Sequence, residues 1–387
     1  MNTGSRFLFV VPPLAGHVNP AGAVARVLLA RGHDVAWTGP ESALRRMLGD
    51  GVTVYPTGMR PYGGQRDRGA RALKSLWEGF VAPFARFTRP AVARAVAAYR
   101  PDVVAVDQHA IAGALVATAN GLPWASLAPQ SMELTEPLRA LPRVDAWIRA
   151  TLAGLWCEAG LPAHEYVDPR FSPHLVLGFT TPALTGPAPF PPHYALVGPA
   201  LDHDRPAGPD FPWAALDPRH RLVLVTMGTL AEDVAREFYP RLMAALAPLG
   251  GQVQAVVTAA PHTVPDPPPN VLVVPRAPFL ELLPRVGAVV CHAGLNTVSE
   301  ALTYGVPLVM APIKHDQPVT AAQVVAAGAG VRVRFGRSGP AELRAALTEV
   351  LDAPTYRAAA ARVAESFASA GGAAAAATRL EHLALRA

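Results

Sequence analysis

Short apolar segments alternate with amphipathic stretches along most of the 387-residue chain. Each apolar segment has four to six residues, the usual length of a strand buried in a parallel sheet. The stretches between them repeat their apolar residues at helical spacing. This alternation predicts an α/β protein with two doubly wound sheets, each covered by helices. The strands predicted for the two halves are 7–11, 34–38, 103–107, 124–127 and 175–179, followed by 222–227, 253–258, 271–274, 288–291 and 307–311.

A helix is predicted between the first two strands. Asn19 can cap its N-terminus, Pro20 suits its first turn and Gly32 ends it. On this interpretation, Gly16 and His17 lie before the helix, at the mouth of the first sheet.

A proline-rich segment separates the two halves. Residues 185–213, TGPAPFPPHYALVGPALDHDRPAGPDFPW, keep neither helical nor strand periodicity, which favours a semi-rigid connector. We therefore expect a first domain over 1–205 and a second over 218–370. The spacing also predicts a last helix in 371–387, and it does not decide whether that helix packs back on the first domain.

Charge and cysteine content narrow the class of protein. The net charge is +5, lysine occurs only at Lys74 and Lys314, and the arginines are scattered, which argues against a nucleic-acid-binding surface. Cys157 and Cys291 form neither a disulfide framework nor a metal cluster, so we expect a cytoplasmic protein. No apolar run approaches the roughly 20 residues of a membrane span, so no integral membrane contact is expected.

One stretch carries the most specific chemistry. In residues 291–318, CHAGLNTVSEALTYGVPLVMAPIKHDQP, His292 ends a predicted strand and Asn296 and Thr297 begin a helix. The unpaired N–H groups and the dipole of a helix start favour a phosphate. The alternative is that His292 is an ordinary loop histidine and that Thr297 with Glu300 is only a capping box.

The continuation of this stretch adds sugar-binding groups. Asp316 and Gln317 follow the strand at 307–311, and an acid beside an amide can accept from and donate to neighbouring hydroxyl groups of a hexose. Glu300 can accept from a ribose. Phosphate, ribose and hexose together indicate a nucleotide sugar.

These motifs resemble those of a known family. Residues 291–331 resemble the donor-binding signature of the family-1 glycosyltransferases, which runs His-x-Gly, Asn-Thr, Glu, Gly-Val-Pro, Pro, Asp-Gln and Gly-x-Gly. LVTMGT at 224–229, RGHDVAW at 31–37 and PPLAGHVNP at 12–20 resemble its other motifs. The resemblance implies the GT-B fold, in which two Rossmann-like domains face each other, with the acceptor in the first domain and the donor in the second. The chain length suits the bacterial branch that modifies macrolides, aromatic polyketides, indolocarbazoles and carotenoids.

The resemblance also assigns the donor site. Thr320 and Ala293 depart from the family pattern, which usually has asparagine and glycine there. Arg276 matches the region that holds the nucleobase, so the expected donor is a UDP- or dTDP-sugar. The residues assigned to the donor are Thr229, Arg276, His292, Gly294, Asn296, Thr297, Glu300, Asp316 and Gln317.

His17 and Asp107 are the predicted catalytic residues. Asp107 ends the strand at 103–107 and can reach the same rim as His17, and a carboxylate on one imidazole nitrogen leaves the other free to take a proton. The alternative is a histidine that only fixes its loop. By resemblance, His17 is the general base of an inverting displacement and Asp107 is its partner. No metal is expected, because Asp202, His203 and Asp204 lie in the proline-rich connector and are interpreted as a solvated linker.

An apolar acceptor pocket is predicted beside His17. Its candidates are Trp77, Phe80, Phe84 and Met132, each of which is individually as well explained by an ordinary core position. Collectively they favour a hydrophobic small-molecule acceptor over a free sugar.

The sequence therefore predicts a metal-independent glycosyltransferase that needs no cofactor, since the nucleotide sugar is a co-substrate. It is expected to be a monomer or weak homodimer. Two alternatives remain, an epimerase of the same fold and a non-catalytic protein that binds a nucleotide sugar. A dinucleotide-binding oxidoreductase is disfavoured, because no G-x-G-x-x-G follows the first strand.

Overall fold

The structure is a computed structural model that describes residues 4–58, 67–203, 211–228 and 236–386. It contains two sheets, one in each half of the chain, and every described strand pair is parallel. The first sheet has the order β3-β2-β1-β4-β5-β6-β7 and the second β10-β9-β8-β11-β12-β13. The fold class expected from the sequence, two doubly wound α/β sheets, is confirmed.

The strands of the first sheet are β1 (Arg6–Val10), β2 (Asp34–Gly39), β3 (Thr53–Pro56), β4 (Val103–Asp107), β5 (Trp124–Ala128), β6 (Leu175–Gly178) and β7 (Tyr194–Leu196). Those of the second sheet are β8 (Arg221–Thr226), β9 (Val253–Thr258), β10 (Val271–Val274), β11 (Val286–Cys291), β12 (Leu308–Met310) and β13 (Gly330–Arg332).

The helices described in the first half are α1 (Ala15–Ala30), α2 (Glu41–Leu48), α3 (Gly69–Leu76), α4 (Ala82–Tyr99), α5 (Ala112–Ala119), α6 (Ser131–Thr135), α7 (Pro142–Glu158) and α8 (Pro182–Thr185). Those described in the second half and the tail are α10 (Tyr239–Leu246), α11 (Phe279–Leu282), α12 (Leu295–Thr303), α13 (Gln317–Ala326), α14 (Pro340–Asp352), α15 (Pro354–Ala370) and α16 (Gly372–Ala384). A single π-helical turn, Trp77–Val81, joins α3 to α4.

The strand order of each sheet fixes where a ligand can bind. In the first sheet β1 lies between β2 and β4, and in the second β8 lies between β9 and β11. The chain leaves such neighbouring strands in opposite directions, which opens a crevice at their carboxyl ends. The residues that follow β1, β4, β8 and β11 therefore lie at the two crevices.

Helix α1 begins earlier than the sequence pattern predicts. It starts at Ala15 and has Leu14 as N-cap, so the prediction that Asn19 caps the helix is wrong. Pro20 lies inside the helix, where its missing N–H leaves the carbonyl of Gly16 without the usual helical donor. As a consequence, His17 belongs to the first turn of α1 and not to the loop before it.

The proline-rich segment is also more ordered than predicted. Strand β7 (Tyr194–Leu196) lies within it and pairs with β6 at the edge of the first sheet. A short edge strand tolerates the surrounding prolines, because one side of its backbone needs no ladder partner. The interpretation of 185–213 as connector throughout is therefore corrected at this strand.

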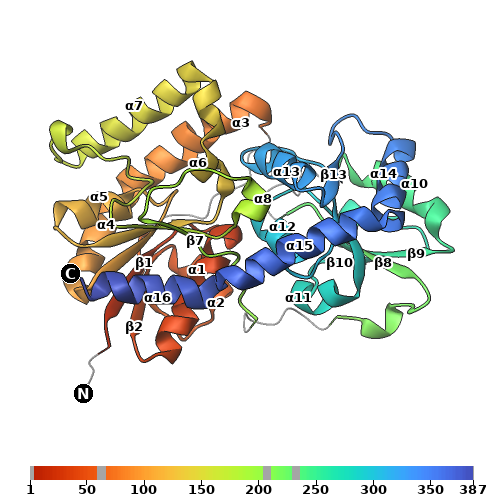
Figure 1. Ribbon diagram of the computed structural model, residues 1–387, viewed down its shortest axis with the longest axis horizontal. Helices are drawn as coiled ribbons and strands as arrows, with labels where there is room; N and C mark the ends of the chain where they lie inside the picture. Colours follow the sequence, from red (N-terminus) through yellow and green to blue (C-terminus); the bar gives the residue numbers. More distant parts are fainter. Residues whose placement is uncertain (1–3, 59–66, 204–210, 229–235, 387) are drawn as a thin grey trace.

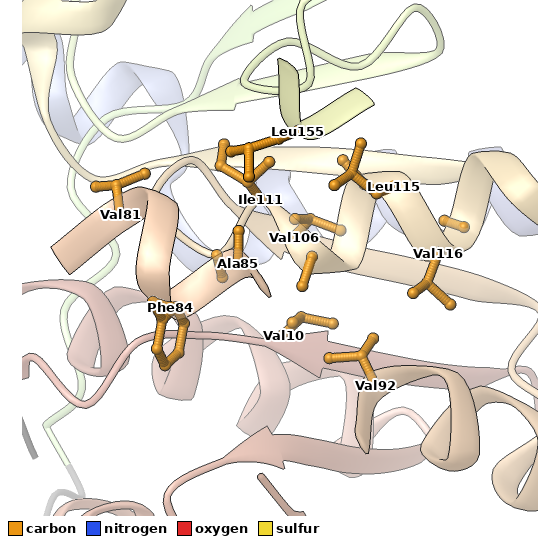
Figure 2. Close-up of a cluster of buried hydrophobic side chains, with 14 of the residues drawn as sticks. Val10, Val81, Phe84, Ala85, Val92, Val106, Ile111, Leu115, Val116 and Leu155 are labelled. Carbon is orange, nitrogen blue, oxygen red and sulfur yellow. The ribbon is translucent and has the colours of Figure 1, made fainter. Parts of the chain in front are cut away.

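The first sheet has a hydrophobic core on each face. On one face Val10 and Val106 from the sheet form a cluster with Phe84 of α4 and Ile111, the N-cap of α5 (Figure 2). On the other face the core includes Phe9 together with residues of α1 and α16. Each such side chain contributes roughly 1.5–3 kcal/mol when it is fully buried.

The C-terminal helices connect the two halves. Figure 1 shows α15 along the second half and α16 across the first, where it contacts α1. Glu381 of α16 accepts hydrogen bonds from Arg31 at 2.7 Å and from the ring of His33 at 3.0 Å, and Leu380 is fully buried. At the junction of α15 and α16, the N–H of Gly372 donates to the carbonyl of Val197, 2.6 Å away.

Among the helices in the described part of the chain, none is long and apolar enough to cross a membrane.

Candidate active site

A cavity of about 360 Å³ lies between the two halves. The first half lines it with residues that follow β1, β4 and β5 and with part of the π-helical turn, and the second half with residues that follow β8, β11 and β12. The two walls approach closely, since a Cβ built on Gly16 lies 4.0 Å from the Cβ of Asn296. The predicted site residues on its lining are His17, Phe80, His292, Gly294, Asn296, Thr297, Glu300, Asp316 and Gln317.

His17 and Asp107 form a buried pair on the wall of the first half. Nδ1 of His17 lies 2.8 Å and 3.0 Å from the two carboxylate oxygens of Asp107, which also accepts from the backbone N–H of His109 at 2.8 Å. Since a carboxylate only accepts, Nδ1 carries the proton. Nε2 is then the basic nitrogen, and the amide nitrogen of Gln130 lies 3.3 Å from it. The arrangement leaves Nε2 able to take a proton once a substrate group replaces Gln130.

A second buried histidine–carboxylate pair lies beside the first. The ring of His109 is 5.0 Å from that of His17 between centroids, and its Nε2 is 3.5 Å from Glu133. Burial raises the pKa of the Glu133 carboxyl, but the hydrogen bond and charge of His109, together with the charge of Arg170 and a backbone hydrogen bond, outweigh it, so that the net shift is downward. No sequence motif points to Glu133, which lies 24 residues from His109 along the chain.

The opposite wall is built around the start of α12. Gly294 is its N-cap and provides no side chain to cap the first N–H groups, so these remain available to an anion. His292 lies half-buried against this helix start, and its Nδ1 is buried with no hydrogen-bond partner among the described residues. Removal of the ring from water, helped by the charge of Lys314, lowers the pKa of His292 to about 4, so the ring is neutral at pH 7. It can therefore act there as a neutral hydrogen-bonding group, and it carries no positive charge.

Two glycines make room for the His292 ring. A Cβ on Gly294 would lie 2.6 Å from Nε2, and a Cβ on Gly228 would lie 2.7 Å from the same ring. Gly228 also has a φ of +74°, a conformation that favours glycine. The adjacent Ala293 has a φ of +67°, so alanine adopts a left-handed conformation where the family pattern has glycine.

Asn296 and Glu300 lie one turn apart on the same face of α12. The Asn296 amide donates to Oε1 of Glu300 at 3.3 Å, and Glu300 is buried. Both side chains line the cavity. Asn296 therefore holds in position the Glu300 carboxylate, which is predicted to accept a hydrogen bond from the ribose.

The loop after β12 carries the predicted sugar-binding pair. Oε1 of Gln317 accepts from the backbone N–H groups of Ile313 at 2.8 Å and Lys314 at 3.0 Å, which leaves its amide nitrogen to donate to a ligand. Asp316 is buried, and burial, followed by the negative charge of Glu133, raises its pKa to about 7. Near neutral pH its carboxyl group is present in both protonation states, so it can donate as well as accept.

Four predicted residues lie elsewhere. Trp77 and Met132 line a separate cavity of about 20 Å³, and Phe84 packs in the core shown in Figure 2. Arg276 is exposed and does not line the larger cavity, and Thr229 lies outside the described residues.

The interpretation of Asp202 as part of a solvated linker is wrong. Its side chain is buried and forms an ion pair with Arg26 of α1 at 2.9 Å, so its charge is satisfied within the fold. Asp204 lies outside the described residues. Within the described ranges, no group of three or more histidine, cysteine, aspartate or glutamate side chains is arranged to hold a metal ion.

The chain is similar to proteins of known family. The model of the erythromycin biosynthesis protein CIII-like C-terminal domain matches residues 240–383. The chain is 30% identical to 4'-demethylrebeccamycin synthase of Lentzea aerocolonigenes over 95% of its own length and 96% of that protein. It is 29% identical to the zeaxanthin glucosyltransferase of Pseudescherichia vulneris, covering 86% and 87% of the two chains. Among solved structures, a spinosyn rhamnosyltransferase complexed with thymidine diphosphate has a TM-score of 0.78 at 23% identity, covering 97% of this chain and all of that one.

Proposed function

The chain belongs to the family of bacterial natural-product glycosyltransferases, and we propose that it moves a hexose from a UDP- or dTDP-sugar to a hydrophobic acceptor with inversion at the anomeric carbon. The attacked group is a hydroxyl or a ring N–H. Residues 1–205 bind the acceptor and residues 218–370 the donor, and the reaction uses no metal.

One observation carries this proposal. His17, which is paired with Asp107, and the start of α12 line the same cavity from opposite walls. A base on one wall and an anion-binding helix start on the other are the two groups that a direct displacement needs, since the nucleophile and the leaving group lie on opposite sides of the sugar carbon.

The base side follows from the tautomer of His17. The acceptor replaces Gln130 at Nε2 and gives its proton to that nitrogen while its oxygen or nitrogen forms the new bond to the anomeric carbon. Asp107 stays ionised, keeps the ring oriented and stabilises the imidazolium that forms. General-base catalysis of this kind contributes about 10²- to 10⁴-fold.

The leaving-group side follows from the exposed N–H groups of α12. The bond between the anomeric carbon and the diphosphate oxygen breaks, and its electron pair goes to the diphosphate. The helix start and the neutral ring of His292 stabilise this charge. Preorganised donors of this kind contribute about 3–4 kcal/mol each.

The test compares wild type with His17→Ala. The chain is incubated with UDP- or dTDP-glucose and a panel of macrolide, aromatic and carotenoid acceptors, and products are detected by mass spectrometry. We expect His17→Ala to lose transfer while its affinity for UDP or dTDP, measured by calorimetry, stays within about twofold. Transfer at the wild-type rate by this variant would refute the assignment of the base.

Two further measurements address the remaining parts of the proposal. The anomeric proton coupling of the product establishes inversion or retention, and a retained configuration would contradict direct displacement. Full activity in excess EDTA is expected, and loss of activity that magnesium restores would contradict metal independence.

A further inference from the structure

The two lysines of this chain lie in opposite environments. Lys74, on α3, has a side chain that is 69% exposed and lies 3.6 Å from the Glu78 carboxylate. Lys314 is only 2% exposed and lines the cavity between the halves. A buried lysine is rare unless its charge is used or compensated, because removing an ammonium group from water is costly.

The backbone around Lys314 is held in place. Its N–H donates to Oε1 of Gln317 at 3.0 Å, and its carbonyl accepts from the N–H of Gln317 at 3.2 Å. The loop after β12 therefore presents this lysine from a fixed position next to the predicted sugar-binding pair. Burial lowers the pKa of Lys314, and the carboxylate of Asp67, just before α3, opposes this shift with a favourable charge from the first half.

The remaining basic groups on the second half's wall do not supply positive charge. Burial, helped by the charge of Lys314, lowers the pKa of both His292 and His315 to about 4. Both rings are therefore neutral at pH 7. Among the described residues that line the cavity there is no arginine, and Lys314 is the single lysine.

We propose that Lys314 binds the diphosphate of the donor and balances the negative charge that grows on it as the sugar leaves. This inference rests on the proposed function, since it concerns the same site. The lysine remains protonated throughout: the electron pair of the breaking bond goes to the diphosphate oxygen, and the acceptor proton goes to His17. A lysine ammonium is a compact charge that suits a phosphate group approached from one side.

The first experiment measures ligand affinity by calorimetry. Wild type, Lys314→Met, Lys314→Arg and the matched control Lys74→Met are each titrated with UDP, dTDP, uridine and thymidine. We expect Lys314→Met to bind the diphosphates about 10- to 100-fold more weakly and the nucleosides unchanged, since a hydrogen bond to a charged group is lost. Lys314→Arg should stay within about fivefold of wild type, and Lys74→Met should match it.

The outcomes separate this inference from the function it rests on. If wild type binds neither diphosphate, the proposed function fails as well. If wild type binds them and Lys314→Met binds them equally well, only the role of Lys314 fails. An equal loss of nucleoside and diphosphate affinity in Lys314→Met would indicate a purely structural role and would also overturn the inference.

A second experiment on the wild-type chain avoids any folding defect of the variants. In protein labelled with [ε-¹³C]lysine, two lysine side chains give signals, and Lys74→Met assigns them. Addition of UDP or dTDP should shift the Lys314 signal, whereas the matching nucleoside should leave it in place. If the chemical shift of the Lys314 signal stays unchanged at a saturating concentration of UDP or dTDP, the inference is overturned.

Discussion

The substitution Gly294→Ala tests whether the position of His292 controls nucleotide binding. Gly294 has a φ of −65° and a ψ of 134°, which alanine adopts without strain, so the change acts only through space. The new Cβ would lie 2.6 Å from Nε2 of His292, whereas real Cβ contacts closer than 3.4 Å are uncommon. The imidazole or the start of α12 must therefore move by roughly 0.8 Å.

The expected cost follows from the packing around the ring. The His292 ring lies within 2.7 Å of the Cβ positions built on both Gly228 and Gly294, so a displaced ring has little free space. Overpacking of a filled site costs about 1–3 kcal/mol. If this free energy is lost from nucleotide binding, the dissociation constant for UDP or dTDP is about 5- to 150-fold higher in the variant than in wild type.

Gly339→Ala is a matched control. Gly339 is the N-cap of α14, has a φ of −82°, and a Cβ there would have no heavy atom within 4 Å. Both variants are titrated with UDP and dTDP by calorimetry and melted by circular dichroism. If Gly294→Ala binds both nucleotides as tightly as Gly339→Ala, His292 and the start of α12 are not part of the nucleotide site.

Two further predictions concern buried groups. Because the pKa of Asp316 is raised from 3.8 to about 7 by burial, its proton is retained in the folded state as the pH rises from about 4 to 7, and the folded state loses stability over that window. The free energy of unfolding is measured in urea at pH 5 and pH 8. Between these two pH values it should fall by roughly 2–3 kcal/mol less in Asp316→Asn than in wild type. An equal fall in both proteins would contradict the raised pKa. Cys157 is exposed, whereas burial raises the pKa of the Cys291 thiol to about 12. Ellman's reagent should therefore titrate one thiol per native chain and two after denaturation, and rapid reaction of two native thiols would contradict the burial of Cys291.

The central strands could be predicted from sequence, whereas three of the four edge strands could not; the exception is β10. Each of the ten predicted strands overlaps an observed one, and the ranges 103–107, 253–258 and 271–274 are matched in full. The three missed strands, β3, β7 and β13, all lie at sheet edges. An edge strand is covered on fewer sides, so it is short and does not need a continuous apolar run.

The candidate site could be predicted where it follows from strand order. His17 and Asp107 are 90 residues apart, yet they lie in contact because β1 and β4 are neighbours. Local patterns carry no information about contacts such as that between His109 and Glu133, which depends on how α6 packs. For the same reason, sequence alone could not separate Phe80, which lines the cavity, from Phe84, which packs in the core.

The contact between Gly372 and Val197 has a mechanical consequence. The chain passes between the halves once after β7 and again at the junction of α15 and α16, and here the two passages are bonded side by side. A Cβ on Gly198 would also lie only 2.9 Å from the carbonyl oxygen of Phe367, so the passages are in direct contact. Two domains that are joined along one edge can rotate relative to each other about that edge, which then acts as a hinge. An opening of the cavity that keeps these contacts intact is therefore a rotation about this edge, and it widens the cavity most on the side farthest from the edge.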